Sequence, residues 1–250
     1  MAWERLHGAG LGLAVALLAG CGGGSGPSTS GTAPPPTTAP AQGCTGSCLA
    51  ADSQLTVADV NTVIAQAVAE AQANSLPATI AVVDRVGNVL GVYRMTSARG
   101  TVTITSNRGV TGGLENLIVP SELAAIAKAI TGAYLSSEGN AFTTRTASQI
   151  VQQAFNPGES NQPSGPLFGV QFSQLPCSDL MQRFSAGQSL GPQRSPLGLS
   201  ADPGGFPLYK NGVPVGGIGV AADPTYGLDP NIFDRDRDLD EMIALAGTFN

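Results

Sequence analysis

Histidine is the first residue type to consider, because it is the side chain that most often moves a proton or binds a metal at neutral pH. The 250-residue chain has one histidine, His7, and we predict below that the segment containing it is removed. A mature chain without imidazole excludes Ser-His-Asp and Cys-His catalysis, histidine-based zinc sites and a proximal-histidine haem ligand. No other catalytic set is visible, so we expect a binding protein rather than an enzyme.

The first of four cysteines lies directly behind an apolar run at residues 11–19. This run is too short to cross a bilayer, because a spanning helix needs about 20 residues. It ends in Leu18-Ala19-Gly20-Cys21, which resembles the bacterial lipobox, whose cysteine carries the acyl chains. We predict a lipoprotein signal peptide at 1–20 and lipidation of Cys21. The alternative is an ordinary signal peptide followed by an incidental cysteine.

Lipidation predicts an exported protein anchored to a membrane, on the periplasmic or the outer-surface side. Residues 21–43 are rich in Gly, Ser, Thr and Pro, and such a composition cannot bury a core, so we expect a disordered tether. We assign the folded part, residues 44–250, to a single domain. The net charge of −6 and the pI of about 4.6 argue against nucleic acid as a partner.

The three other cysteines are Cys44, Cys48 and Cys177. An oxidising exported compartment permits disulfides. Cys44 and Cys48 are separated by three residues, which does not match a redox or zinc Cys-x-x-Cys pair. We predict a bridge from Cys48 (or Cys44) to Cys177, with a local Cys44–Cys48 bridge as the alternative.

Helical and strand patterns alternate along the domain, which predicts a fold that contains both helices and strands. Thr56 and Asp59 have the spacing of a helix-capping box, and Asn211-Gly212 is a strong signal for a two-residue hairpin. The expected helices are near 55–74, 121–134, 145–155, 178–184 and 236–246. The expected strands are 79–84, 89–95, 167–172, 206–210 and 213–220.

The order of these motifs resembles the GlcG/HbpS-like heme-binding family. The resemblance covers Leu55-Thr56, the run from Thr79 to Asp84, and Arg94-Met95. It continues in Arg145-Thr146-Ala147 and in two glycine-rich segments, 204–208 and 212–220. It implies an α/β (α+β) fold: a profilin-like sandwich in which helices flank an antiparallel sheet. Residues 97–140 and 157–204 are longer than in compact members of that family.

The resemblance implies a protein that binds haem, a related tetrapyrrole or a small carboxylate, and that forms a homo-oligomer. Two alternatives follow from it as well. One is an accessory module whose long loops dock on a membrane sensor protein. The other is an enzyme that degrades haem oxidatively; without histidine, its general base would have to be a carboxylate or a tyrosine.

Arg94 and Arg145 lie on the matching motifs, and their guanidinium groups suit haem propionates or another carboxylate. The alternative for both is a salt bridge to Asp84, Glu115 or Glu138.

Other positions on the matching motifs could also contact a ligand. Thr146 would donate a hydrogen bond to the ligand, or cap the helix. Gly204 and Gly205 would offer backbone N–H groups to an anion, or supply positive φ angles in a turn. Since no histidine follows His7, which lies in the predicted signal peptide, a tyrosine or methionine would have to bind haem iron, and the candidates are Tyr93, Met95, Tyr134 and Tyr209.

Overall fold

The structure is a computed structural model that describes residues 53–151, 165–187, 195–229 and 237–249. The chain separates into two units, Met1–Gln42 and Gly43–Asn250, and every described residue belongs to the second unit. Cys21, Cys44 and Cys48 lie outside the described residues. Cys177 is exposed and has no disulfide partner among the described residues, so its pairing stays a prediction.

The central sheet has the strand order β2-β1-β6-β5, and all its neighbouring strands are antiparallel. Its hairpins form where β-branched runs meet the predicted turns. Asn211 and Gly212 at the second turn both have positive φ angles, as a two-residue hairpin requires. The strands are β1 (Thr79–Asp84), β2 (Val89–Arg94), β5 (Gly205–Lys210) and β6 (Val213–Ala221).

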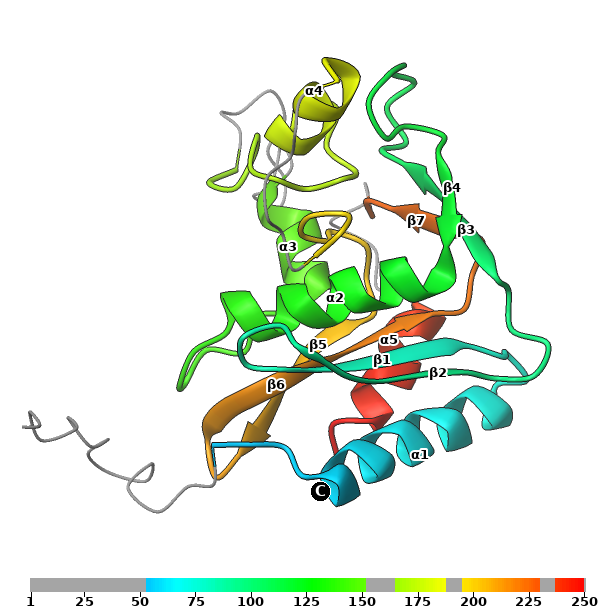
Figure 1. Cartoon of the computed structure of the whole chain (residues 1–250), viewed down its shortest axis with the longest axis vertical. Helices are drawn as coiled ribbons and strands as arrows, with labels where there is room; N and C mark the ends of the chain where they lie inside the picture. The colour runs from blue at the N-terminus through cyan, green and yellow to red at the C-terminus, as the bar shows by residue number, and fades with distance from the viewer. Residues whose placement is uncertain (1–52, 152–164, 188–194, 230–236, 250) are drawn as a thin grey trace, which may run out of the picture. The chain divides into compact units, whose positions relative to one another are not determined.

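Helices cover both faces of this sheet, as Figure 1 shows. Helices α1 (Val57–Ala73) and α5 (Leu239–Ala246) lie on one face, and α2 (Ser121–Leu135) lies on the other. Strand β1 is buried on both sides: Ile80 packs with α1 and α5, whereas Ala81 packs with α2. The predicted fold class, an antiparallel sheet flanked by helices, is confirmed.

Two glycines of β6 explain how closely α2 approaches the sheet. A Cβ atom at Gly217 would collide with the carbonyl oxygen of Ala129, and one at Gly219 would collide with that of Ala125. Glycine within a strand marks a close approach of backbone or ligand, and here it is the backbone of α2 that approaches.

A second sheet was not predicted. It has the order β4-β3-β7, in which β3 pairs antiparallel with β4 and parallel with β7. Its strands are β3 (Thr101–Thr105), β4 (Ile118–Pro120) and β7 (Thr225–Gly227). Strands β3 and β4 lie within residues 97–140, a stretch that we predicted to be longer than in compact members of the family.

The predicted strand at 167–172 is wrong. Turn hydrogen bonds run from Phe168 N to Gly165 O and from Val170 N to Leu167 O, and Gly169 has a φ of +85°. Only Phe172 makes bridges of the β type, and these are isolated. An apolar run of this length is ambiguous, and the turn-forming glycines decide its conformation.

The remaining helices begin within one residue of their predicted starts, and residues 152–155 of the predicted helix at 145–155 lie outside the described residues. They are α3 (Thr144–Val151) and α4 (Asp179–Ser185). The Thr56–Asp59 capping box at the start of α1 is present in full: Asp59 N donates to Thr56 Oγ1, and Thr56 N donates to an Asp59 carboxylate oxygen. Across the described ranges, no helix is both long enough and apolar enough to cross a membrane.

Candidate ligand-binding groove

An apolar groove of about 330 Å³ lies between α1 and strand β2, which forms one edge of the central sheet. Its volume is at the lower end of the range of about 300–1,000 Å³ that is usual for ligand sites. The lining residues are Leu55, Thr56, Val57, Val60, Asn61, Ile64, Leu90, Gly91, Val92 and Tyr93.

Gly91 forms the floor of the groove, which we call the α1–β2 groove. A Cβ atom at Gly91 would lie 3.2 Å from Val60 Cγ1 and 3.4 Å from Ile64 Cδ1. Any larger side chain there would fill the groove or displace α1. The absent side chain therefore lets α1 pack close to β2 at the base of the groove.

The walls of the groove carry apolar side chains that remain exposed. Val57 is 79% exposed and Leu90 is 40% exposed. Leu90 is also the extra residue of a β-bulge, since Val82 pairs with Gly91 and Val83 pairs with Val89. Bulges are frequent at sheet edges and beside functional sites, where they redirect a side chain.

A second hollow, of about 400 Å³, shares Leu55 and Leu90 with the groove and extends it toward the β1–β2 turn. Its other lining residues include Asp84 and Arg85. The Arg85 guanidinium donates to the carbonyl oxygens of Ala133 and Ser136 at the end of α2. The edge of the sheet thus presents an apolar floor that leads to a polar end, which suits an amphipathic ligand.

Tyr93 is the predicted ligand residue that lies in this groove. It is 46% exposed, and it lies two residues after Gly91 in the strand, so both face the same side of the sheet. Among the described residues, no hydrogen bond engages the Tyr93 hydroxyl.

The structure gives the other candidate iron ligands different partners. The hydroxyl of Tyr134 donates to Val86 O at 2.9 Å. The hydroxyl of Tyr209 lies 2.9 Å from Ser137 O and 3.1 Å from Asn140 O. The sulfur of Met95 accepts from the Ala78 N–H at 3.4 Å and packs in the core.

Arg94 follows Tyr93 and points toward the opposite face, where its Nη1 lies 3.4 Å from a carboxylate oxygen of Glu122 in α2. The predicted alternative of a salt bridge is therefore present, with Glu122 in place of the acids we named. Half of the Arg94 side chain stays exposed, and its ligand role stays a prediction.

Arg145 lies away from Arg94, at the start of α3. Its Nε lies 2.7 Å from Glu241 Oε2 in α5, and its Nη1 lies 2.9 Å from Asp229 Oδ2. This again matches the salt-bridge alternative with different acids. The Thr146 N–H donates to Thr143 Oγ1, so Thr143 caps the helix that we expected Thr146 to cap.

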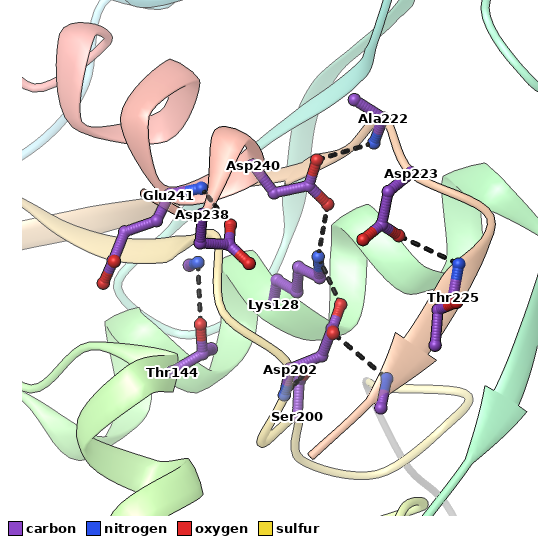
Figure 2. A network of polar contacts seen from close by, with 12 residues as sticks. Lys128, Thr144, Ser200, Asp202, Ala222, Asp223, Thr225, Asp238, Asp240 and Glu241 are labelled. Carbon is purple, nitrogen blue, oxygen red and sulfur yellow. Dashed lines mark hydrogen bonds and ion pairs between the residues drawn. The ribbon is translucent and has the colours of Figure 1, made fainter. Parts of the chain in front are cut away.

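Gly204 and Gly205 contact a polar centre that includes Thr144 and Asp240, which Figure 2 shows. The Gly205 N–H donates to Thr144 Oγ1 at 2.8 Å, so a protein group already uses this donor. Gly204 has a φ of +110°, and a Cβ there would lie 2.7 Å from Asp240 Cβ. Gly204 therefore has the positive φ angle that the alternative predicted, whereas Gly205 has none and packs against the Lys128 carbonyl oxygen.

The core of this polar centre was missed by sequence reasoning. Lys128 Nζ donates to Asp240 Oδ2 at 2.8 Å and contacts Asp202 Oδ2 as well. Each carboxylate also accepts one backbone N–H, that of Ala222 for Asp240 and that of Gly227 for Asp202. The one sequence feature that could have indicated this cluster is Lys128 itself, a lysine within the alanine-rich sequence of α2.

Burial sets the electrostatics of this cluster, because Lys128 is only 1% exposed. Desolvation raises the pKa of Asp240 to about 6, although the Lys128 charge opposes that shift. Desolvation likewise raises the pKa of Asp202 well above its usual value. For Lys128, desolvation lowers the pKa, but the two carboxylates outweigh it and the net pKa is raised.

The helices and strands described above define a class of protein. It is a mixed α/β domain with helices on both faces of an antiparallel sheet and an apolar groove at the β2 edge of that sheet. Residues 55–109 match the model of a family described as haem degrading protein HbpS-like. This match confirms the resemblance to the GlcG/HbpS-like family, over the segment that holds α1, β1, β2 and β3. No curated protein matches the chain significantly.

Several solved structures are similar to the chain. The PduOC:heme complex is 20% identical, with a TM-score of 0.44, and the match covers 78% of this chain and 93% of that one. HbpS is 23% identical, with a TM-score of 0.44, and covers 78% and 89%. The Klebsiella pneumoniae protein ORFY is 20% identical, with a TM-score of 0.43, and covers 78% and 88%.

Proposed function

We propose that this protein binds haem or a related tetrapyrrole in the α1–β2 groove. One observation carries the proposal: every residue that lines the groove falls within residues 55–109, the segment that matches the haem-family model. The segment that matches the family model is therefore the segment that forms the α1–β2 groove.

The residues of the groove fit the chemistry of this ligand. A porphyrin has broad apolar faces, and burial of apolar surface drives its binding. Val57, Ile64 and Leu90, which line the groove, would contact such a face. Haem, when bound, would supply an iron centre for redox or oxygen chemistry. The protein would supply the apolar contact surface and a phenol group.

A hemin titration tests this proposal. The mature chain, residues 21–250, would carry Cys21→Ser so that no acyl chain is attached. We expect a saturable shift of the Soret band at one hemin per chain. A Soret shift that fails to saturate, or no shift, contradicts the proposal.

Two matched variants separate specific binding from adhesion to exposed apolar surface. Leu90→Asp places a charge in the groove and is expected to weaken hemin binding by at least about tenfold. Ile118→Asp changes a 67% exposed residue of the other sheet and should leave the affinity unchanged. Equal loss in both variants would contradict a site at the groove.

We also propose that the protein is exported and held at a membrane through lipidated Cys21. The apolar run and the lipobox-like Leu18-Ala19-Gly20-Cys21 support this. Cell fractionation of the full chain tests it, with the wild type in the membrane fraction and Cys21→Ser released from it. A Cys21→Ser variant that stays with the membrane as firmly as the wild type would contradict acylation at this site.

A further inference from the structure

We infer that the hydroxyl oxygen of Tyr93 is the protein ligand to the iron of the haem bound in the α1–β2 groove. This inference rests on the proposed function, because it names the residue of the same site that contacts the metal. Tyr93 lies on β2, an edge strand of the central sheet, and lines the groove.

The partners of the competing side chains separate Tyr93 from them. The hydroxyls of Tyr134 and Tyr209 are directed at backbone carbonyl oxygens. To bind iron, either hydroxyl would have to give up these contacts. Met95 Sδ accepts a backbone N–H and packs in the core. The Tyr93 hydroxyl has no such partner in the described chain, so binding a metal costs it no protein hydrogen bond.

The position of Tyr93 supports the same choice. Tyr93 lines the groove directly, whereas Tyr134 and Tyr209 are absent from its lining. Tyr93 is paired with Ile80 of β1, so its backbone is fixed within the sheet. The strand therefore presents the phenol at the rim of an apolar surface whose floor, at Gly91, has no side chain.

The charge balance of the complex favours a phenol ligand. Tyrosine is an established haem ligand through its phenolate oxygen. When the oxygen binds ferric iron, it displaces the hydroxide that the iron carries in solution, and this hydroxide takes the phenol proton and leaves as water. The ferric porphyrin core carries one positive charge, which the phenolate neutralises, and a neutral iron centre is less costly to place against apolar residues than a charged one.

The test compares Tyr93→Phe with Tyr134→Phe and Tyr209→Phe in hemin titrations followed by visible absorption and electron paramagnetic resonance. We expect the wild-type ferric complex to show a phenolate-to-iron charge-transfer band and a high-spin signal. Tyr93→Phe should lose that band and bind hemin at least about tenfold more weakly. The other two variants should keep both the spectrum and the affinity.

A replacement ligand provides the positive control. Tyr93→His supplies an imidazole at the same position, so it should restore hemin affinity and give a nitrogen-ligated spectrum instead of the phenolate band. We expect each variant to fold, because Tyr93 is 46% exposed and Tyr93→Phe keeps the ring; thermal melting of each apo variant checks this.

The outcomes distinguish this inference from the proposed function. If wild type binds hemin saturably and Tyr93→Phe shows the same spectrum and affinity, Tyr93 is not the ligand and the proposed function stands. If the band disappears in Tyr134→Phe or Tyr209→Phe instead, that residue is the ligand and the inference is overturned. If the wild type does not bind hemin, the proposed function fails, and the inference fails with it.

Discussion

Lys128 Nζ lies 2.8 Å from Asp240 Oδ2, and this ion pair joins α2, on one face of the central sheet, to α5, on the other. The absence of a side chain at Gly219 of β6 leaves room for the lysine, because a Cβ atom there would lie 2.9 Å from Lys128 Cβ. Asp202, from the loop before β5, contacts the same ammonium group. One buried cation therefore connects three segments that are distant in sequence.

Replacing this cation should destabilise the protein strongly. Lys128→Met leaves two buried carboxyl groups without their counter-ion, and breaking a buried pair in this way costs about 3–5 kcal/mol of unfolding free energy. Urea unfolding followed by circular dichroism measures the loss.

The only other lysine in the chain, Lys210, provides the matched control for that experiment. It lies 2.7 Å from Asp59, and both side chains are partly exposed. Lys210→Met should cost about 0–1 kcal/mol. Similar losses for the two variants would show that the Lys128 cluster is not the main electrostatic support of the fold.

The raised pKa of Asp240 predicts a pH dependence of stability. The pKa is 3.8 in the unfolded chain and about 6 in the native state, so between these values the native state holds more protons. This group therefore makes the native state less stable as pH rises from about 3.8 to about 6. The raised pKa of Asp202 acts in the same direction. Asp59, whose pKa is lowered to about 2 by its bonds to Lys210 and Thr56, titrates below this window.

Comparison with Asp240→Asn isolates the effect, because the variant lacks this titration. The wild type should have its greatest advantage in unfolding free energy near pH 4, and the advantage should shrink toward neutral pH. An advantage that grows with pH would mean that Lys128 lowers the pKa of Asp240, contrary to our assignment.

The sequence was sufficient to predict the central part of the fold, because its signals are local. The capping box at Thr56 and the hairpin turn at Asn211-Gly212 depend only on neighbouring residues, and both formed as predicted. The short strands β4 (Ile118–Pro120) and β7 (Thr225–Gly227) have no such signal. Each has three residues, and β7 pairs with a strand more than a hundred residues earlier, so only tertiary packing defines it.

The candidate site was predictable only in part, for a similar reason. Tyr93 could be named because the only histidine, His7, lies in the predicted signal peptide and few other side chains bind iron. The role of Gly91 depends on how close α1 lies to β2, which no sequence pattern expresses. The Lys128–Asp240 contact joins residues 112 positions apart, and without the fold each appears as an ordinary helical residue.

Filling the floor of the groove should block the ligand. Gly91 has no left-handed backbone conformation, so a side chain there strains no dihedral angle. Gly91→Val would occupy the space beside Val60 and Ile64, and we expect hemin affinity to fall by at least about tenfold. Gly91→Ala should show a smaller decrease. Affinities that do not decrease with side-chain size would place the ligand elsewhere.

The two arginines on the family-like motifs should behave differently when each is replaced by glutamine. Arg145 connects α3 to α5 through Glu241 and to the segment after β7 through Asp229, and its side chain is 20% exposed. Arg145→Gln should therefore lower the unfolding free energy by about 2 kcal/mol and leave hemin affinity unchanged. Arg94 adjoins Tyr93, and its cation is half exposed, so Arg94→Gln should leave stability nearly unchanged but weaken hemin binding by roughly threefold at low salt.

Salt provides the internal check on the Arg94 prediction, because an exposed charge attracts the ligand carboxylates less as the Debye length shortens. The affinities of the wild type and Arg94→Gln should therefore converge as ionic strength rises, when hemin titrations are repeated at several salt concentrations. If Arg145→Gln weakened hemin binding while Arg94→Gln did not, the ligand carboxylates would lie beside α3, and the polar centre of Figure 2 would be the binding site instead of the α1–β2 groove.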